Sequence, residues 1–226
     1  MLSIKKFDTD SSPPRRGPTR KETRLSEAES YANLASANAY FGIFPSSSLD
    51  IASFTSRIHT DALALDSYHN VLHSLLLFRR IHDSWPLTLT VVSHAFKKPR
   101  IVEGHCAAIG FPLERVRFIG IDPPGMRAAT AAAAAADDDD EHQRNTEVSD
   151  GDKAGLIAGV QRAVDEWSQD PHGVGMSLAG KRRARNPWGL DDRLFASAEE
   201  RASSGVATRI VAGHEALVEH AKRPWA

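Results

Sequence analysis

The sequence predicts an α/β fold built on a parallel sheet. Two short segments rich in β-branched residues, 87–93 and 116–121, are typical of strands. Between them, residues 99–109 carry apolar side chains at helical spacing, among them Ile101 and Cys106. A strand–helix–strand order of this kind joins parallel strands by a helical crossover. The apolar content of 87–93 also indicates burial on both faces, which is typical of parallel sheets.

The N-terminal part predicts irregular chain followed by a helix. Residues 1–24 hold prolines, a glycine and scattered charges without an apolar period. Ser26 and Glu29 then form a capping-box pattern, in which each side chain accepts a hydrogen bond from a backbone amide of the first turn. A helix is therefore expected to begin at Ser26 and to end before Gly42 and Pro45.

The clearest helical period lies at residues 68–81, where apolar side chains recur at steps of three and four. Asp66 or Ser67 is the expected N-cap, and Pro86 ends the segment. A further helix is expected over 152–168.

Beyond that helix, a turn-rich segment leads to a tail. The segment from Asp170 to Gly189 is rich in glycine and proline, which favours turns. The tail at 206–220 is weakly amphipathic and is expected to be helical.

These elements predict one domain with appendages. A run of alanines followed by four aspartates indicates a disordered, low-complexity insertion. A solvated acidic loop is favoured there over a Mg²⁺ site, because unfolded carboxylates are not preorganised for a metal. The predicted divisions are an irregular N-terminus at 1–16, one α/β domain at 17–122 and 152–188, the insertion at 123–151, and a partly helical C-terminal tail at 189–226.

Composition excludes several classes of protein. A net charge of −1 over 226 residues argues against a globally basic nucleic-acid binder. The single cysteine, Cys106, excludes an intrachain disulfide and a cysteine zinc site. No apolar run approaches the roughly 20 residues of a spanning helix, and the N-terminus lacks a signal-peptide core. We therefore expect a cytoplasmic protein.

Polar residues at the end of the first strand predict an anion site. Ligands bind outside the carboxyl ends of parallel strands, and Ser93 and His94 occupy that edge. Lys97, Lys98 and Arg100 follow at a helix start, where backbone amides and cations both favour negative charge. A phosphate or carboxylate ligand is the expected partner, against the alternative of solvated basic residues.

Other residue patterns are weaker. Asp66, Ser67 and Asn70 surround one helix start, and capping explains only one of them. His69 and His73 are spaced to share a metal, but without a third ligand exposed histidines are the favoured interpretation. The remaining features have structural explanations: Cys106 is expected to be buried, and the basic run at 181–185 to be structural or phosphate-facing.

Five segments form a series: GPTRKETRLSEAESYANLA, ALDSYHNVLHSLLLFRR, LTVVSHAFKKPRIVEGHCAAIGF, FIGIDPP and DPHGVGMSLAGKRRARNP. Together they resemble the domain of unknown function 218 family, of the ElyC/SanA/YdcF type, in its fungal branch. The similarity covers residues 17–124 and 152–188. It implies a Rossmann-like, three-layer α/β domain. Some members of the family are linked to S-adenosylmethionine binding and others to envelope biology in bacteria.

The resemblance also implies individual site residues. The Ser-Glu-Ala glutamate of the family falls on Glu27. The Gly-Gly-x-Thr segment falls on the stretch that ends at Thr19, with Arg16 and Gly17 where a glycine pair is expected. The strand-end Thr-Ser pair of the family falls on Ser93 and His94.

Two family blocks are altered in this chain. The Thr-x-Glu-Asn block falls on Ser67 to Asn70, so that His69 replaces the glutamate. The His-Met-Pro-Arg block falls on Lys97 to Arg100, so that a lysine replaces the histidine. Acid–base roles that depend on the replaced glutamate and histidine are therefore not carried over.

The beginning of the domain departs from the family. Such domains open with an apolar strand and a glycine-rich turn, and residues 1–16 contain neither. Two strands cannot cover the apolar faces of at least four amphipathic helices. The sequence therefore predicts that the first strands are missing and that the chain is poorly stable alone.

The predicted function is the binding of a small anionic or nucleotide-like ligand at the sheet edge, with S-adenosylmethionine as a candidate cofactor. Whether the chain is an enzyme stays open, with Glu27 as the candidate base. The alternatives are a non-catalytic regulatory module and the inactive product of a truncated reading frame. No metal, nucleic-acid or membrane partner is expected. The predicted ligand-binding residues are Thr19, Glu27, Ser67, Asn70, Ser93, His94, Lys97 and Arg100.

Overall fold

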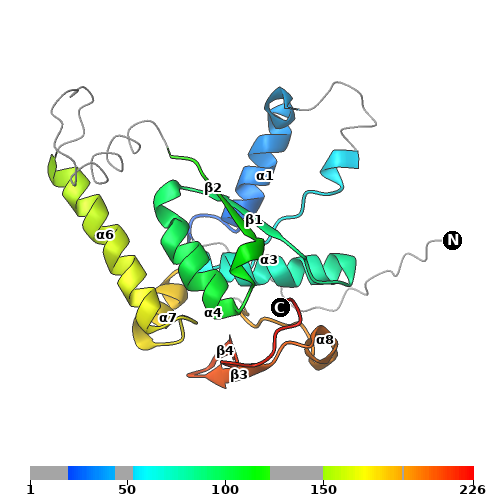
Figure 1. Cartoon of the computed structure of the whole chain (residues 1–226). Helices are drawn as coiled ribbons and strands as arrows, with labels where there is room; N and C mark the ends of the chain where they lie inside the picture. Colours follow the sequence, from blue (N-terminus) through cyan, green and yellow to red (C-terminus); the bar gives the residue numbers. More distant parts are fainter. Residues whose placement is uncertain (1–19, 44–52, 123–149, 190) are drawn as a thin grey trace. The chain divides into compact units, whose positions relative to one another are not determined.

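The protein is a mixed α/β protein, and its computed structural model describes residues 20–43, 53–122, 150–189 and 191–226 (Figure 1). The chain forms two compact units. Unit 1 comprises residues 1–63 and 183–191, and unit 2 comprises residues 64–182 and 192–226. The irregular N-terminus predicted at 1–16 and nearly all of the predicted insertion lie outside the described residues. None of the described helices is both long and apolar enough to cross a membrane.

Unit 1 contains helix α1, Glu27–Ala37, which begins as the sequence predicts. The Ser26 hydroxyl accepts from the Glu29 amide at 3.1 Å, and the Ser26 amide donates to the Glu29 carboxylate at 3.0 Å. The capping box is therefore confirmed. A short 3₁₀ turn at Ala39–Gly42 follows. In the same unit, the Trp188 indole N–H donates to the Arg20 carbonyl at 3.1 Å.

Unit 2 contains the parallel sheet that the sequence predicts. Strands β1, Leu89–Ser93, and β2, Val116–Gly120, pair in parallel, from Leu89 opposite Val116 to Ser93 opposite Gly120. Asp122 lies two residues after the end of β2, so Ser93 and Asp122 lie at the same edge of the sheet.

The crossover between the two strands differs from the expected α-helix. Its first part, Pro99–Cys106, is a π-helix, labelled η3, and only Ala107–Ile109 (α4) is α-helical. A π-helix bonds residues five apart and is therefore wider than an α-helix. Ile101, Cys106 and Ile109 of the apolar period are buried, whereas Val102 is half-buried. His105 is buried beside them, with 1% of its surface exposed.

One face of the parallel sheet packs against the hydrophobic core of unit 2. Leu89 and Val91 of β1, and Val116 and Phe118 of β2, pack against it. On the opposite face Val92 is 60% exposed. The described part of the chain thus shows a helical layer against one face of this sheet, and the three-layer arrangement stays a prediction.

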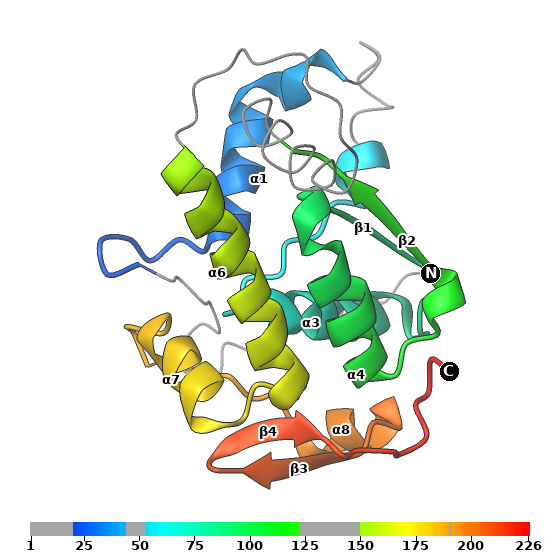
Figure 2. The same ribbon diagram turned by 60° about the vertical axis from the view of Figure 1, so that its left-hand side comes forward.

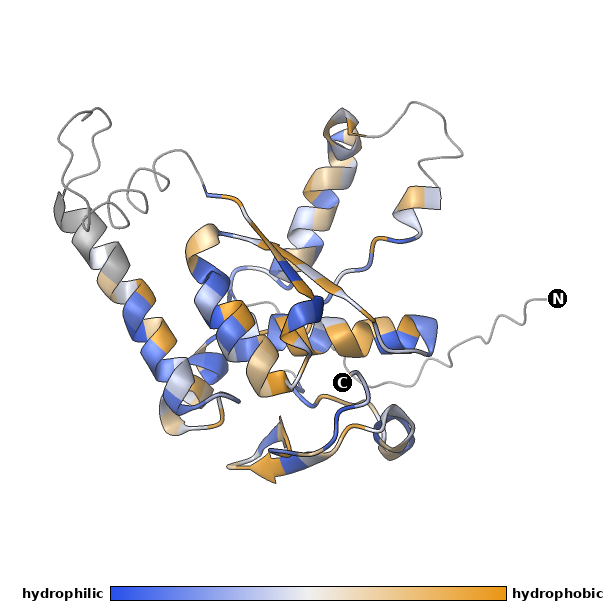
Figure 3. Ribbon diagram, viewed as in Figure 1, coloured by the Kyte–Doolittle hydropathy of each residue, from blue (hydrophilic) through white to orange (hydrophobic). Residues whose placement is uncertain are grey.

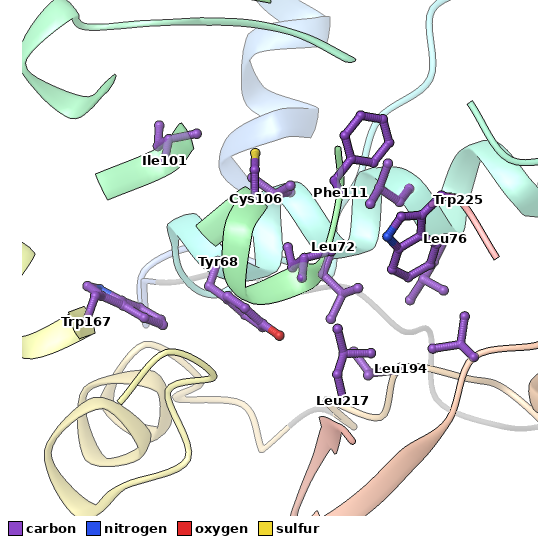
Figure 4. Close-up of a cluster of buried hydrophobic side chains, with 14 of the residues drawn as sticks. Tyr68, Leu72, Leu76, Ile101, Cys106, Phe111, Trp167, Leu194, Leu217 and Trp225 are labelled. Carbon is purple, nitrogen blue, oxygen red and sulfur yellow. The ribbon is translucent and has the colours of Figure 1, made fainter. Parts of the chain in front are cut away.

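Helix α3, Ser67–His82, runs through the centre of that core, and Figure 3 shows hydrophobic residues along its middle and hydrophilic residues at its C-terminal end. Asp66 is its N-cap, as predicted, because its side chain accepts from the His69 amide. Figure 4 shows residues of α3 surrounded by side chains from η3, α6 and the C-terminal segment. Helix α6, Asp150–Gln169, contributes Trp167, whose ring stacks on that of Tyr68 at 5.8 Å. The predicted helices at 68–81 and 152–168 are therefore confirmed.

The prediction of a helix at 206–220 is wrong, because this segment forms two strands. Thr208–Val211 (β3) and His214–Leu217 (β4) form an antiparallel hairpin, preceded by helix α8, Ala198–Ser204 (Figure 2). The two residues between the strands, Ala212 and Gly213, have φ values of 49° and 85°, the signature of a type I′ hairpin turn.

The hairpin is fastened to the rest of unit 2 by apolar and polar contacts. Leu217 and Trp225 lie in the same hydrophobic core as α3. The buried Glu215 carboxylate accepts from the Leu194 amide at 2.9 Å and from Arg201 of α8 at 3.0 Å. The C-terminal segment therefore completes the core of unit 2.

The segment expected to consist of turns contains a further helix, α7, Met176–Ala184. Gly173 and Gly175 precede it. The Asp170 carboxylate accepts from the amides of Val174 and Gly175, at 3.1 and 2.7 Å, and so fixes the turn before the helix. Because glycine and proline near a short helix favour turns, composition alone predicts turns where the structure has a helix.

Candidate ligand-binding pocket

A pocket of about 290 Å³ lies in unit 2 between strand β1 and helix α3. This volume is just below the range of about 300–1,000 Å³ that is typical of small-molecule sites. All five residues of β1 line it, and α3 contributes three polar side chains at positions i, i+3 and i+7. The remaining lining residues come from α3 and from the turn and helix after β1. The lining residues are Ser67, Asn70, Val71, Ser74, Leu89 to Ser93, Lys97 and Ile101.

The α3 wall of the pocket is fixed by the N-cap. The Asp66 carboxylate accepts from the His69 amide at 2.8 Å with one oxygen and from Arg182 Nε at 2.8 Å with the other. Both side chains of this ion pair are almost fully buried, at 6% and 2% exposed. Because separating a buried ion pair leaves an uncompensated buried charge, the pair stabilises the position of the first turn of α3, which carries Ser67.

Ser67 is also held from the opposite side. Its hydroxyl lies 2.8 Å from Nε2 of the buried His105. Burial, together with the charge of Arg100, lowers the pKa of His105 to about 4. The imidazole is therefore neutral near pH 7. A single hydrogen bond joins it to the Ser67 hydroxyl, and either group can be the donor.

The carboxyl end of β1 is shaped by the chain that follows β2. The Asp122 carboxylate accepts from the Ala95 amide at 2.9 Å, and His94 Nδ1 donates to the Ile121 carbonyl at 3.1 Å. A Cβ at Gly120 would lie 2.7 Å from that of Ala95, so only glycine allows this approach. These contacts fix the turn that carries Lys97 to the pocket.

Lys97 is the one ionisable side chain among the lining residues. It lies in a 3₁₀ turn, Ala95–Lys97, directly after β1, with its ammonium 5.8 Å from the centre of the Phe96 ring. The same pocket wall carries the hydroxyl groups of Ser67 and Ser93 and the amide of Asn70. This set of groups can neutralise and hydrogen-bond an anion.

The structure brings together half of the residues predicted as ligand-binding. Ser67, Asn70, Ser93 and Lys97 line the pocket. His94 and Arg100 lie in the adjacent turn and helix but are not among the lining residues. The His94 ring stacks on Phe96 at 5.5 Å instead.

The other two predicted residues lie elsewhere in the chain. Glu27 is an exposed residue of α1 in unit 1, where its carboxylate accepts from the Tyr31 hydroxyl at 3.0 Å. Thr19 falls outside the described residues.

The burial of two histidines is not what the sequence predicts. His69 and His73 were expected to be exposed, yet they are 3% and 1% exposed, with ring centres 4.8 Å apart. Burial lowers the pKa of both rings well below the usual value. The physical reason is that core elements surround α3 on more sides than an amphipathic period indicates. Within the described ranges, no group of three or more side chains suited to a metal ion is found.

Two other side chains behave as predicted. Cys106 is buried, and burial raises the pKa of its thiol to about 11, so the thiol is unreactive at neutral pH. In the basic run, Arg182 bonds to Asp66 and Lys181 forms an ion pair with Glu166 of α6. These two cations have the structural role that was one of the expected alternatives.

Comparison with known proteins gives one distant relative. Over 140 residues, the chain is 26% identical to "Uncharacterized protein YOR238W" of Saccharomyces cerevisiae (strain ATCC 204508 / S288c). The match covers 62% of this chain and 41% of the yeast protein, so the chain spans less than half the length of that relative. No family model and no solved structure matches the chain. The chain is therefore similar to a fungal protein whose name gives no activity.

Proposed function

We propose that the pocket between β1 and α3 binds a small anionic ligand through a carboxylate or phosphate group. The observation that carries the proposal is the composition of the pocket wall: one lysine, several hydroxyl and amide groups, and no acidic side chain. The pocket lies beside a strand of a parallel sheet and includes Ser93 and Lys97 at its carboxyl end, which is where ligands of such sheets bind. We also propose that the pocket belongs to a Rossmann-like domain of the domain of unknown function 218 type, and that the protein is located in the cytoplasm.

The pocket suits a simple anion better than S-adenosylmethionine. The sulfonium centre of that cofactor is positively charged, and here it would meet Lys97 with no carboxylate among the lining residues to balance it. The wall also offers no acidic group for ribose hydroxyls, which nucleotide sites of related folds use.

Binding without turnover is favoured over acid–base catalysis. The imidazole that contacts the pocket residue Ser67 belongs to His105, whose pKa is about 4. A general base is most effective when its pKa lies near the working pH, so His105 is a weak base at pH 7. Glu27, the candidate base from the sequence, is bonded to Tyr31 in unit 1. A binding or regulatory module is therefore the form of the proposal that the geometry supports best.

The test is a calorimetric titration of the full chain with inorganic phosphate and with succinate. Lys97→Met is expected to weaken binding about tenfold or more, because a hydrogen bond to a charged group contributes about 1.5–3 kcal/mol. Lys98→Met is the matched control: this neighbouring lysine is exposed and does not line the pocket. Equal losses in both variants would indicate diffuse electrostatic attraction and would contradict the proposal.

A further inference from the structure

Among the residues that the structure describes, strand β1 has a free edge along the pocket. In the described residues the sheet has two strands, so β1 is paired on one side only. The Ser93 carbonyl accepts from the Ile121 amide at 2.8 Å, which shows that the backbone of Ser93 points towards β2. Backbone groups of neighbouring residues in a strand point to opposite edges. The N–H and C=O groups of Thr90 and Val92 therefore point away from β2.

The two residues that carry these outward backbone groups belong to the pocket wall. Thr90 and Val92 both line it, together with α3 on the other side. The gap between a free strand edge and a helix is the geometry in which an extended peptide adds a strand to a sheet. The pocket also offers Val71 and Ile101, each 6% exposed, as an apolar surface for one side chain of such a peptide.

The position of the positive charge selects the direction of the peptide. Lys97 follows the carboxyl end of β1, and no acidic residue lines the pocket. A peptide parallel to β1 would bring its own carboxyl end to Lys97, whereas an antiparallel peptide would bring a positively charged amino end there. Charge complementarity therefore favours a parallel strand that ends in a free carboxylate.

We propose that the pocket recognises the carboxyl terminus of an extended peptide, which adds to the free edge of β1 as a parallel strand and places its terminal carboxylate at Lys97. This inference deepens the proposed function and rests on it, because the peptide terminus is the anionic group. The backbone groups of Thr90 and Val92 bind the peptide main chain, and Val71 and Ile101 receive one apolar side chain.

The probe is an N-acetylated pentapeptide of alternating alanine and valine with a free C-terminal carboxylate, titrated calorimetrically into the full chain. Amidation of the carboxyl end is expected to weaken binding about tenfold or more, since it removes the charged partner of Lys97. Methylating the peptide amides one at a time is expected to weaken binding only at alternate positions, because only alternate amides of a strand point to one edge.

One substitution in the protein tests the same edge. Val92→Pro removes an outward N–H that β2 does not use, at an edge position where proline is tolerated. It is expected to weaken peptide binding severalfold, with the circular dichroism spectrum checking that the fold is retained. Lys98→Met, which changes a residue outside the pocket, is expected to bind the peptide as the unmodified chain does.

The outcomes separate this inference from the proposed function. Binding of phosphate or succinate without tighter binding of the pentapeptide would overturn the peptide site and leave the anion site standing. Loss of binding for both probes would overturn both. Equal affinity for the acid and amide peptides, or no alternation in the methylation series, would overturn the peptide site alone. A dimer in sedimentation that Val92→Pro abolishes would assign the edge to a second copy of the chain and would also overturn it.

Discussion

The Ser67 hydroxyl oxygen lies 2.8 Å from Nε2 of His105, a residue 38 positions later in the chain. This bond joins the first turn of α3 to the π-helical segment η3 at the wall of the pocket. It connects a group that can reach a ligand to one that is fully buried. The stability of the pocket wall and the position of the Ser67 hydroxyl therefore both depend on the bond between Ser67 and His105.

Ser67→Ala is expected to destabilise the protein by about 1–3 kcal/mol, because it leaves a buried imidazole nitrogen without its partner. Ser74→Ala, on the same face of α3 and also lining the pocket, is the matched control. As Ser74 is exposed, its replacement is expected to change the free energy of unfolding by less than about 0.5 kcal/mol. Urea unfolding of both variants measures the difference, and equal changes would contradict a role for the Ser67–His105 bond.

The free energy of unfolding is expected to fall as the pH is lowered from about 6.5 to about 4. Burial lowers the pKa of His69, His73 and His105 below the unfolded value of 6.5, to about 4 for His105. The unfolded chain therefore binds more protons in this range, and protonation favours unfolding. The contribution of the neutral, buried histidines to the free energy of unfolding is complete above pH 6.5. It is lost as the pH falls towards the pKa values of these histidines in the folded state. Urea titrations at several pH values between 7.5 and 4.5 measure it.

His73→Leu is the variant that tests the cause of this pH dependence. Both ring nitrogens of His73 are buried, with no hydrogen-bond partner in the described part of the chain. The substitution is expected to leave stability at pH 7.5 unchanged or higher, and to flatten the decline in acid. His82→Gln, at an exposed position of the same helix, is expected to keep the full decline. If the free energy of unfolding declined equally steeply in the unmodified chain, in His73→Leu and in His82→Gln, the buried imidazole of His73 would not be the source of the decline.

Arg182→Met is expected to destabilise the protein by about 3–5 kcal/mol, because it leaves the buried carboxylate of Asp66 without its cation. Lys181→Met is the matched control, one residue away in the same helix. Its ion pair with Glu166 is exposed to solvent and is expected to contribute less than about 1 kcal/mol. Thermal unfolding compares the two, and a larger loss for Lys181→Met would refute the buried pair as the anchor of α3.

Gly120→Ala is expected to destabilise the sheet edge by about 1–3 kcal/mol, as overpacking does in a close-packed site. The added Cβ would lie 2.7 Å from the Cβ of Ala95. Gly159→Ala in α6 is the control of opposite sign: nothing lies within 4 Å of its Cβ position, and alanine favours a helix by about 1 kcal/mol. Melting temperatures measure both changes. A neutral Gly120→Ala would show that the turn after β1 has room to move.

The sequence predicted the parts of the fold that local patterns determine. The Ser26 capping box, the long period of α3 and the β-branched composition of β1 and β2 are local features. Ser93 and Lys97 were found because strand ends and helix starts can be located without knowing the packing. Ser67 and Asn70 were found because their polarity exceeds what one helix cap requires.

The parts that failed depend on contacts between distant segments. His105 turns inward because η3 is a π-helix, and an expected α-helical spacing does not reveal it. His69 and His73 are buried because the C-terminal segment and its neighbours add to the core around α3. The hairpin turn at Ala212 and Gly213 could have been found from the β-branched residues Thr208, Ile210 and Val211 before it.

The most direct test of the central claim is a nuclear magnetic resonance titration of the ¹⁵N-labelled chain with inorganic phosphate and with succinate. If the pocket binds the anion, the amide signals of Asn70, Val92 and Lys97 shift in a saturable manner, and those shifts are lost in Lys97→Met but kept in Lys98→Met. Shifts spread evenly over the basic residues of the chain, or persisting unchanged in Lys97→Met, would contradict an anion site between β1 and α3.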